Sequence, residues 1–230
     1  MKFDLTLYLV TDSTCCRTEE TFLRMVEEGL KGGVTLVQLR EKNIGGWEYL
    51  EKALKVKELT DRYQVPLIID DRADVALACG AAGVHVGAED LPVKEARRIL
   101  GPERIVGATA KTVEAARKAY EDGADYLGVG AIYPTTTKVK TVLTGVSTLD
   151  AICRSVPIPA IAIGGLNRGN MEILRGTGIA GIAVVSAIMK AEDPRAAAEG
   201  LKDGVLAMRA EGLTTAKKLR TKEEKRCSGS

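Results

Sequence analysis

The sequence is poor in residues that build metal and nucleophile sites, since it has one histidine, His85, and five cysteines. The cysteines are odd in number and lack the spacing of a metal site, so we expect reduced thiols and a cytoplasmic location. His85 lies inside the apolar run GVHVG, where we expect it to be buried and hydrogen-bonded. No other histidine exists to complete a zinc site, and no Ser–His–Asp arrangement is compelling.

Long hydrophobic segments are also absent. No stretch approaches about 18 uninterrupted apolar residues, so the sequence predicts no membrane-spanning helix. The opening residues, MKFDLTLYLVTD, place an acid inside a short apolar run and offer no small-residue cleavage site, which is unlike a secretory signal.

Positive charge is concentrated at one end of a chain whose net charge is only +2. Residues 213–230 contain six Lys or Arg and two Glu. A basic tail can bind nucleic acid, but this one is short and has no aromatic residue. We therefore expect one domain over residues 1–212, a disordered tail over 213–230, and no nucleic-acid partner.

Short apolar segments alternate with helical patterns along the whole domain. The segments are rich in β-branched residues, as in parallel strands covered on both faces. Eight such units in about 210 residues predict a single (β/α)8 TIM barrel. An open doubly wound sheet is the alternative, but no Gly-x-Gly-x-x-Gly turn follows the first strand. The expected strands are 5–12, 34–41, 66–70, 83–87, 104–110, 125–133, 158–165 and 179–186, and the expected helices are 19–33, 47–63, 73–81, 92–100, 112–123, 148–155, 168–178 and 194–212.

Acidic residues follow the third and fourth expected strands. In a barrel the carboxyl ends of all strands meet at one rim, so Asp71 and Asp90 should face each other there. Two carboxylates alone would repel, and one would take up a proton. A hard divalent cation with oxygen ligands removes the conflict, which predicts a Mg²⁺ site. The alternative is a pair of surface aspartates that cap helices.

Several groups at the same rim suit phosphate. Arg40 and Lys42 alternate on the second strand and so point the same way, while Lys138 lies on a long loop, 131–145, that could act as a lid. Backbone N–H groups near Gly165 and Ser186, at expected helix starts, favour a second anion. Solvated surface charges and simple turn chemistry are the alternatives.

With these residues in view, the sequence resembles the thiamine phosphate synthase family over residues 5–205. The motifs that carry the resemblance are LYLVTD, QLREK, IIDDR, GVHVGAED, GADYLGVGAIYPTTTK, AIGG and VVSAI, in this order. The resemblance implies a Mg²⁺-dependent transferase. It would couple 4-amino-2-methyl-5-hydroxymethylpyrimidine diphosphate with hydroxyethylthiazole phosphate, giving thiamine phosphate and diphosphate.

The resemblance also implies roles for individual residues. Asp71 and Asp90 would bind Mg²⁺, and Gln38 would contact the pyrimidine. Arg40, Lys42 and Lys138 would hold the diphosphate. The residues implied at the thiazole phosphate are Thr135, Thr137, Gly165 and Ser186. Further substrate-binding residues would be Asp70, Thr109 and Val185, and the catalytic residues would be Arg40, Thr109 and Lys138.

Two positions depart from the family pattern. The family usually has Asn where this chain has Asp70, and an ionised Asp cannot donate a hydrogen bond to phosphate. The family often has a Ser and a nearby His after the fifth strand, where this chain has Thr109 and Lys111. Our hypothesis is that the Lys111 cation offsets the extra charge of Asp70.

Three other functions fit the sequence less well. A thiazole tautomerase relative would not need two carboxylates and a threonine–lysine loop. Another phosphate-binding barrel isomerase or epimerase would not need two separate anion sites. A non-catalytic phosphometabolite-binding protein would not need a metal. For the synthase we expect small-molecule partners and no membrane. A homo-oligomer is left open.

Overall fold

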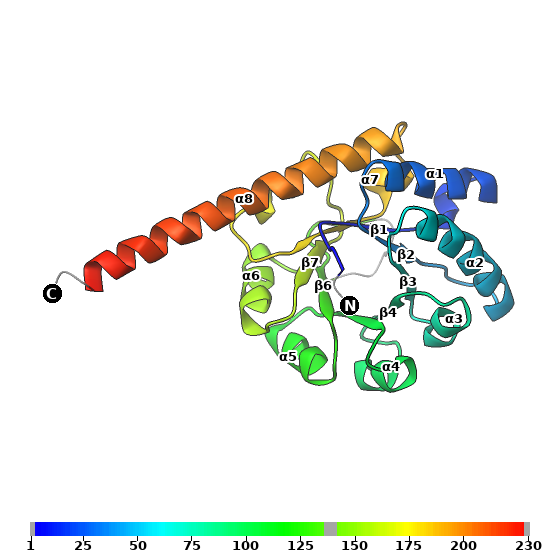
Figure 1. Cartoon of the computed structure of the whole chain (residues 1–230), viewed down its shortest axis with the longest axis horizontal. Coiled ribbons are helices and arrows are strands. Elements are labelled where there is room, and N and C mark those ends of the chain that lie inside the picture. The colour runs from blue at the N-terminus through cyan, green and yellow to red at the C-terminus, as the bar shows by residue number, and fades with distance from the viewer. Residues whose placement is uncertain (1–2, 136–141, 228–230) are drawn as a thin grey trace.

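The strands form a closed parallel barrel. The computed structural model describes residues 3–135 and 142–227, with the backbone alone described after residue 210. The strands are hydrogen-bonded in chain order, and β8 (Gly181–Val184) closes the ring by pairing with β1 (Leu7–Val10). The helices surround this ring (Figure 1). The predicted (β/α)8 barrel is confirmed, and the closure of β8 on β1 excludes an open doubly wound sheet.

The strands are short and nearly all buried. Their shortness leaves little room for polar residues except at the carboxyl ends, where the loops begin. They are β1, β2 (Leu36–Leu39), β3 (Leu67–Asp70), β4 (Gly83–Val86), β5 (Ile105–Thr109), β6 (Tyr126–Gly130), β7 (Ala160–Ile163) and β8.

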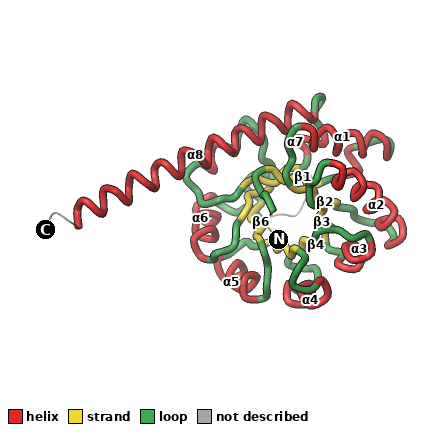
Figure 2. The backbone as a smooth tube through the Cα atoms, viewed as in Figure 1, coloured by secondary structure: helices red, strands yellow, loops and turns green. Residues whose placement is uncertain are grey.

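The helices lie around the outside of the barrel, and α8 extends beyond it (Figure 2). Thr18 and Thr112 cap α1 and α5 with their side chains, which satisfies backbone N–H groups in the first turns. The helices are α1 (Glu19–Lys31), α2 (Gly46–Arg62), α3 (Ala73–Ala78), α4 (Val93–Leu100), α5 (Val113–Glu121), α6 (Val146–Ser155), α7 (Ser186–Met189) and α8 (Pro194–Cys227), with 3-10 turns at η1 (Ser13–Cys15) and η2 (Met171–Leu174).

Two segments differ from the expected helices. The helix expected over 168–178 is only the four-residue turn η2, and Gly176, two residues after it, has a left-handed φ of 83° that does not continue a right-handed helix. The last helix, expected over 194–212, continues as α8 to Cys227. The predicted domain boundary at 212 therefore falls inside α8, and its status as a boundary stays a prediction.

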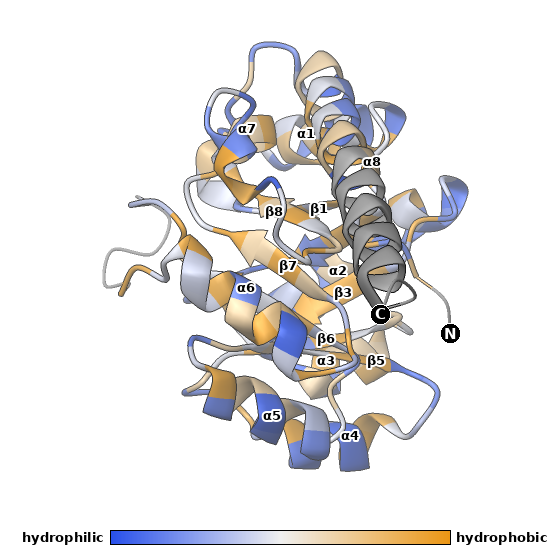
Figure 3. Ribbon diagram, turned by 90° about the vertical axis from the view of Figure 1, so that its left-hand side faces the viewer, coloured by the Kyte–Doolittle hydropathy of each residue, from blue (hydrophilic) through white to orange (hydrophobic). Residues whose placement is uncertain are grey.

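The core has two layers. One fills the barrel interior with alternate strand residues, including Tyr8 and Tyr126, and the other lies between the strands and the helices. Figure 3 shows the hydrophobic strands inside and hydrophilic residues on the outer helices such as α5. In the part of the chain that the structure describes, no helix combines the length and the apolar character that a membrane crossing requires.

Candidate active site

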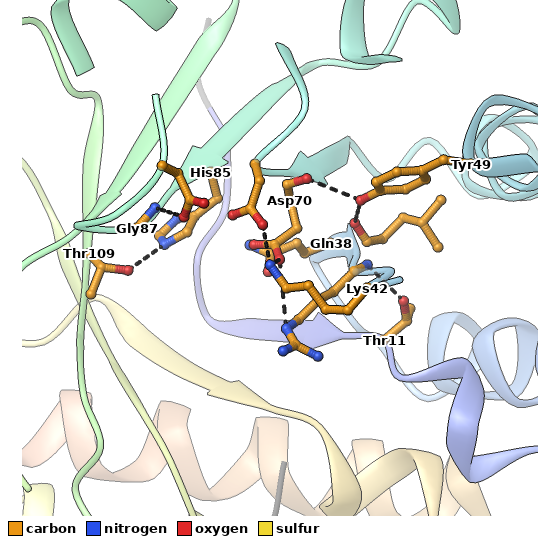
Figure 4. A network of polar contacts seen from close by, with 12 residues as sticks. Thr11, Gln38, Lys42, Tyr49, Asp70, His85, Gly87 and Thr109 are labelled. Atoms are coloured by element: carbon orange, nitrogen blue, oxygen red, sulfur yellow. Dashed lines mark hydrogen bonds and ion pairs between the residues drawn. The ribbon is translucent and has the colours of Figure 1, made fainter. Parts of the chain in front are cut away.

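The carboxylates at the end of β3 and the cations that follow β2 meet at the carboxyl end of the barrel. The Lys42 ammonium contacts the carboxylates of both Asp70, at 3.1 Å, and Asp71. The Arg40 guanidinium lies 3.6 Å from Asp70 (Figure 4). Since β2 and β3 are paired neighbours, alternation along each chain places Arg40, Lys42 and Asp70 on one face.

Asp70 and Asp71 leave the strand in different directions. Asp70 is the last residue of β3 and is only 7% exposed, because its side chain points into the barrel. Asp71 has a left-handed φ of 62°, and its N–H donates to the His85 carbonyl of β4 at 2.8 Å. The turn at Asp71 aims its carboxylate toward the loop that follows β4.

Asp71 meets Asp90 across this rim, as the sequence predicts for neighbouring strand ends. The two side chains lie within hydrogen-bonding reach, and the Gly87 N–H donates to Asp90 at 3.0 Å. Burial, the charge of Asp70 and the contact with Asp90 raise the pKa of Asp71 to about 6, although Lys42 acts in the opposite direction. Burial alone would lower the Lys42 pKa, but both aspartates outweigh it and the pKa is raised.

The donors at this rim suit a hard cation, although they are few. Among the described residues, no group of three or more His, Cys, Asp or Glu side chains forms a ready metal site. The pair of Asp71 and Asp90 offers carboxylate oxygens in a place where negative charge is already costly, as the raised Asp71 pKa indicates. Such a pair fits Mg²⁺ that completes its coordination with waters and phosphate oxygens.

The segment that carries Arg40 and Lys42 is held by contacts on its outer side and by its backbone. Glu41, between them, points to the helix layer, where Lys52 of α2 lies 3.0 Å from its carboxylate and Ser13 donates to it at 2.8 Å. The Arg40 N–H donates to the Thr11 hydroxyl at 3.2 Å. These contacts fix the direction in which the two cations leave the strand.

Tyr49 of α2 ties the two strands together below the carboxylates. Its hydroxyl contacts the Leu39 carbonyl at 2.7 Å and the Asp70 carbonyl at 3.1 Å. Burial raises the pKa of Tyr49, so the phenol stays protonated and able to donate. Tyr49 is not among the predicted site residues, and its position on the buried face of α2 is its one sequence signal.

Gln38 and Thr109 lie at opposite sides of the barrel interior. Gln38 is 5% exposed and donates through Nε2 to the Tyr8 hydroxyl at 2.8 Å. Thr109, at the end of β5, lies 3.0 Å from His85 Nε2. His85 is hydrogen-bonded through both ring nitrogens, as expected, although it is only half-buried.

The proposed thiazole phosphate residues fall at the ends of β6, β7 and β8. The Tyr133 N–H donates to the Gly164 carbonyl at 3.0 Å, so the segment that leads to Thr135 packs on the Gly164–Gly165 turn. Gly165 has a φ of 65°, and a Cβ there would lie 2.7 Å from the Pro134 carbonyl oxygen. Val185 is half-buried and Ser186 exposed, where α7 begins, while Thr137 and Lys138 lie outside the described residues.

The hypothesis that Lys111 offsets Asp70 gains no support from the contacts. Asp70 already has two cationic neighbours, Arg40 and Lys42. No ion pair of Lys111 is recorded within residues 3–135 and 142–210. The cations that lie nearest the Asp70 carboxylate are therefore Arg40 and Lys42, which follow β2.

Comparisons with known proteins identify the family of the chain. A family model described as thiamine monophosphate synthase matches residues 7–188. Thiamine-phosphate synthase 2 of Streptococcus pneumoniae is 57% identical over 189 residues, covering 82% of this chain and 90% of the relative. Thiamine-phosphate synthase of Methanobrevibacter smithii is 50% identical over 198 residues, covering 86% and 94%.

Solved structures point to the same family. Thiamine phosphate pyrophosphorylase from Pyrococcus furiosus superposes with a TM-score of 0.80 at 41% identity, covering 89% of this chain and 96% of that one. A 3-hexulose-6-phosphate synthase, at 16% identity and a TM-score of 0.65, shares the fold alone. The chain belongs to the thiamine monophosphate synthase family.

Proposed function

We propose that this protein is a thiamine-phosphate synthase, a transferase of thiamine biosynthesis. It couples 4-amino-2-methyl-5-hydroxymethylpyrimidine diphosphate with hydroxyethylthiazole phosphate and releases diphosphate. One observation carries the proposal beyond family membership: Arg40 and Lys42, which follow β2, converge with three aspartates at the barrel mouth. Such a mixed cluster suits a polyanion that binds together with a divalent cation.

Mg²⁺ would be held between Asp71 and Asp90. When bound, it would neutralise part of the charge that gathers on the departing diphosphate. The residues themselves support this assignment, since the raised Asp71 pKa marks negative charge that Lys42 only partly offsets. Asp71 would be ionised at neutral pH in the presence of the cation.

Arg40 and Lys42 would hold the diphosphate, together with Lys138 of the loop. The bond between the pyrimidine methylene and the diphosphate oxygen breaks, and both electrons leave with the oxygen. Opposite unit charges 4 Å apart attract by about 4 kcal/mol at an effective dielectric of about 20. Only the part that grows as the bond breaks accelerates the step, and about 2.7 kcal/mol gives about a hundredfold.

The ring nitrogen of the thiazole then captures the pyrimidine cation, which forms the new C–N bond. No protein nucleophile is required, so the protein must place the two substrates in line. Gln38 would contact the pyrimidine, while Thr109 and Asp70 would lie beside the diphosphate. Residues implied at the thiazole phosphate are Thr135, Thr137, Gly165, Val185 and Ser186.

The proposal includes a cytoplasmic location and leaves the oligomeric state open. It is supported by the described cysteines, which are unpaired thiols, because disulfides are common in oxidising compartments. Small molecules are the only partners that it requires.

One assay tests the function. Purified protein is incubated with both substrates, with and without Mg²⁺, and diphosphate release is followed. We expect release that requires both substrates and the metal. A reaction that omits the thiazole phosphate serves as the control for simple hydrolysis. Release at the same rate without the thiazole, or none with the complete mixture, would contradict the proposal.

A further inference from the structure

A line of buried polar side chains crosses the barrel interior beneath the rim. Tyr8 of β1 and Tyr126 of β6 meet through their hydroxyls at 2.8 Å, and the Tyr126 hydroxyl lies 3.0 Å from His85 Nδ1. Gln38 donates to Tyr8 at one end, and His85 contacts Thr109 at the other. The line therefore joins the residue proposed at the pyrimidine to a hydroxyl proposed at the diphosphate.

The barrel is built to admit these side chains. A Cβ at Gly107 would lie 2.1 Å from the Tyr126 ring, and a Cβ at Gly128 would lie 3.1 Å from the His85 ring. Tyr8 and Tyr126 are 1% and 0% exposed, so water has little access to their hydroxyls. A buried hydroxyl proton without an acceptor costs about 1–3 kcal/mol, which makes the direction of each hydrogen bond consequential.

One direction is fixed by chemistry at the Gln38 end. The amide nitrogen can only donate, so the Tyr8 oxygen accepts from Gln38 and keeps one proton of its own. If Tyr8 donates that proton to Tyr126, Tyr126 donates to His85 Nδ1. The imidazole proton then lies on Nε2 and is donated to Thr109.

The reverse direction leaves a proton unpaired. If His85 Nδ1 donates to Tyr126 and Tyr126 donates to Tyr8, the Tyr8 oxygen accepts twice. Its own proton then has no acceptor among the recorded contacts of the described residues. Thr109 is only half-buried, so an outward proton there can reach a ligand or solvent. The direction that ends at Thr109 therefore leaves no buried hydroxyl proton without an acceptor.

We propose that Tyr8, Tyr126 and His85 form a one-directional hydrogen-bond chain that holds neutral His85 in the Nε2-protonated form. Because Thr109 accepts from His85, its hydroxyl proton is turned outward and is donated to an anionic oxygen of the diphosphate. Tyr126 and His85 are positioning residues, since they act through Thr109 and do not touch the diphosphate. The last step rests on the proposed function, whereas the chain itself does not.

The single histidine makes the chain directly measurable. In the full-length protein labelled with 15N-histidine, long-range proton–nitrogen correlations show which ring nitrogen carries the proton, and His85 gives the only signal. We expect the proton on Nε2 without any substrate. In Tyr126→Phe, Nδ1 loses its donor, and we expect the proton to distribute over both nitrogens. A proton on Nδ1 or on both nitrogens in the unmodified protein, or no change in Tyr126→Phe, overturns the proposal.

Binding of inorganic diphosphate with Mg²⁺ tests the outward end. Calorimetry on Tyr126→Phe and Thr109→Val should each show a loss of about tenfold, and the double variant no more than about tenfold, because Tyr126 acts through Thr109. Additive losses, or unchanged binding in Tyr126→Phe, overturn the role of Thr109. Tyr63→Phe, which removes a hydroxyl bonded to Glu27 outside the barrel, is the matched control and should change neither measurement.

The experiments distinguish a failure of the proposed function from a failure of the hydrogen-bond chain. If the tautomer and the diphosphate losses are as expected but the substrates are not coupled, the proposed function fails and the chain stands. If the substrates are coupled but His85 carries its proton on Nδ1, the function stands and the chain is wrong.

Discussion

Asp71 is the residue at which the needs of stability and of the proposed metal site conflict. Its carboxylate is partly buried beside two other aspartates, and the nearby Lys42 does not compensate fully. A cation between Asp71 and Asp90 would relieve the repulsion, so the folded protein without metal carries a cost that the loaded protein does not. This conflict predicts a stability change that depends on pH.

We predict that Asp71→Asn stabilises the metal-free protein at neutral pH. The folded-state pKa of Asp71 is about 6 and the ordinary value is 3.8, so the folded state holds the proton more tightly than the unfolded chain. Stability therefore falls as pH rises between these values, and the cost is fully present above about pH 6. Asn tolerates the left-handed φ of this position. In EDTA at pH 7.5 we expect the melting temperature to rise by about 2–4 °C.

The same comparison at pH 4 provides the control for Asp71→Asn. There the folded carboxyl is largely protonated, so the difference between variant and unmodified protein should shrink. A lower melting temperature for the variant at pH 7.5 would mean that the ion pair with Lys42 outweighs burial and the repulsion from Asp70.

Asp71→Ala and Lys138→Ala should damage turnover more than thiazole binding. The attraction that Lys138 and the metal proposed at Asp71 exert on the diphosphate grows as the bond breaks and negative charge gathers on the leaving group. Steady-state kinetics should show kcat reduced by about a hundredfold, with the KM for thiazole phosphate changed by less than about threefold. Asp74→Ala removes an acid paired with Arg72 on the outer surface and is the matched control. An effect confined to the thiazole KM would show that these assignments are wrong.

At the scale of elements, the sequence predicted the fold well because each strand is a short apolar run with a polar end. The acids of β3 and β4 could be placed at one rim from topology alone, and the structure brings Asp71 and Asp90 together. The contact between the two interior tyrosines could not be predicted from topology. Tyr8 and Tyr126 resemble ordinary core residues, and only the register across the barrel brings their hydroxyls together.

The length of the last helix shows a second limit of sequence patterns. The pattern predicts where α8 packs, since Ala198, Leu201, Val205 and Met208 recur at helical spacing and are all buried. It does not predict where the backbone stops being helical, because end positions depend weakly on side chains. The side chains of α8 are described up to residue 210, and the buried ones within that range pack on the barrel.

We predict that removing residues 213–230 leaves the enzyme intact. The buried face of α8 and the hydrogen bond from Arg209 to Thr6, at 3.1 Å, are retained in the shortened chain. We expect the melting temperature to change by no more than about 1 °C and the coupling rate to be unchanged. Leu201→Ala is the contrasting variant and should cost about 2–5 kcal/mol of unfolding free energy. A lower coupling rate in the shortened chain would give the tail a function.

At the scale of the whole molecule, the barrel has its buried aromatic rings below and its charged side chains at the carboxyl-end rim. The lower interior is filled by the buried rings of Tyr8 and Tyr126, with Phe3 packed edge-on against Tyr126 at 5.8 Å between ring centroids. The upper rim gathers charges from β2, β3 and β4, which are distant in sequence. Ligands at the rim therefore act on a closed and rigid base, and their binding energy should appear as stability of the whole barrel.

Inorganic diphosphate should stabilise the barrel only together with Mg²⁺. A ligand at about 100 times its Kd adds about 2.7 kcal/mol to folding stability, which corresponds to a shift of about 5–10 °C in melting temperature for a domain of this size. Thermal unfolding should show this shift with both ligands present, and its loss in EDTA or in the Asp71→Asn/Asp90→Asn variant. Asp74→Asn, whose carboxylate lies outside the rim cluster, should keep the full shift. An equal shift in EDTA would mean that Arg40 and Lys42 bind diphosphate without a cation, and the two-carboxylate metal site would then have no part in holding the leaving group.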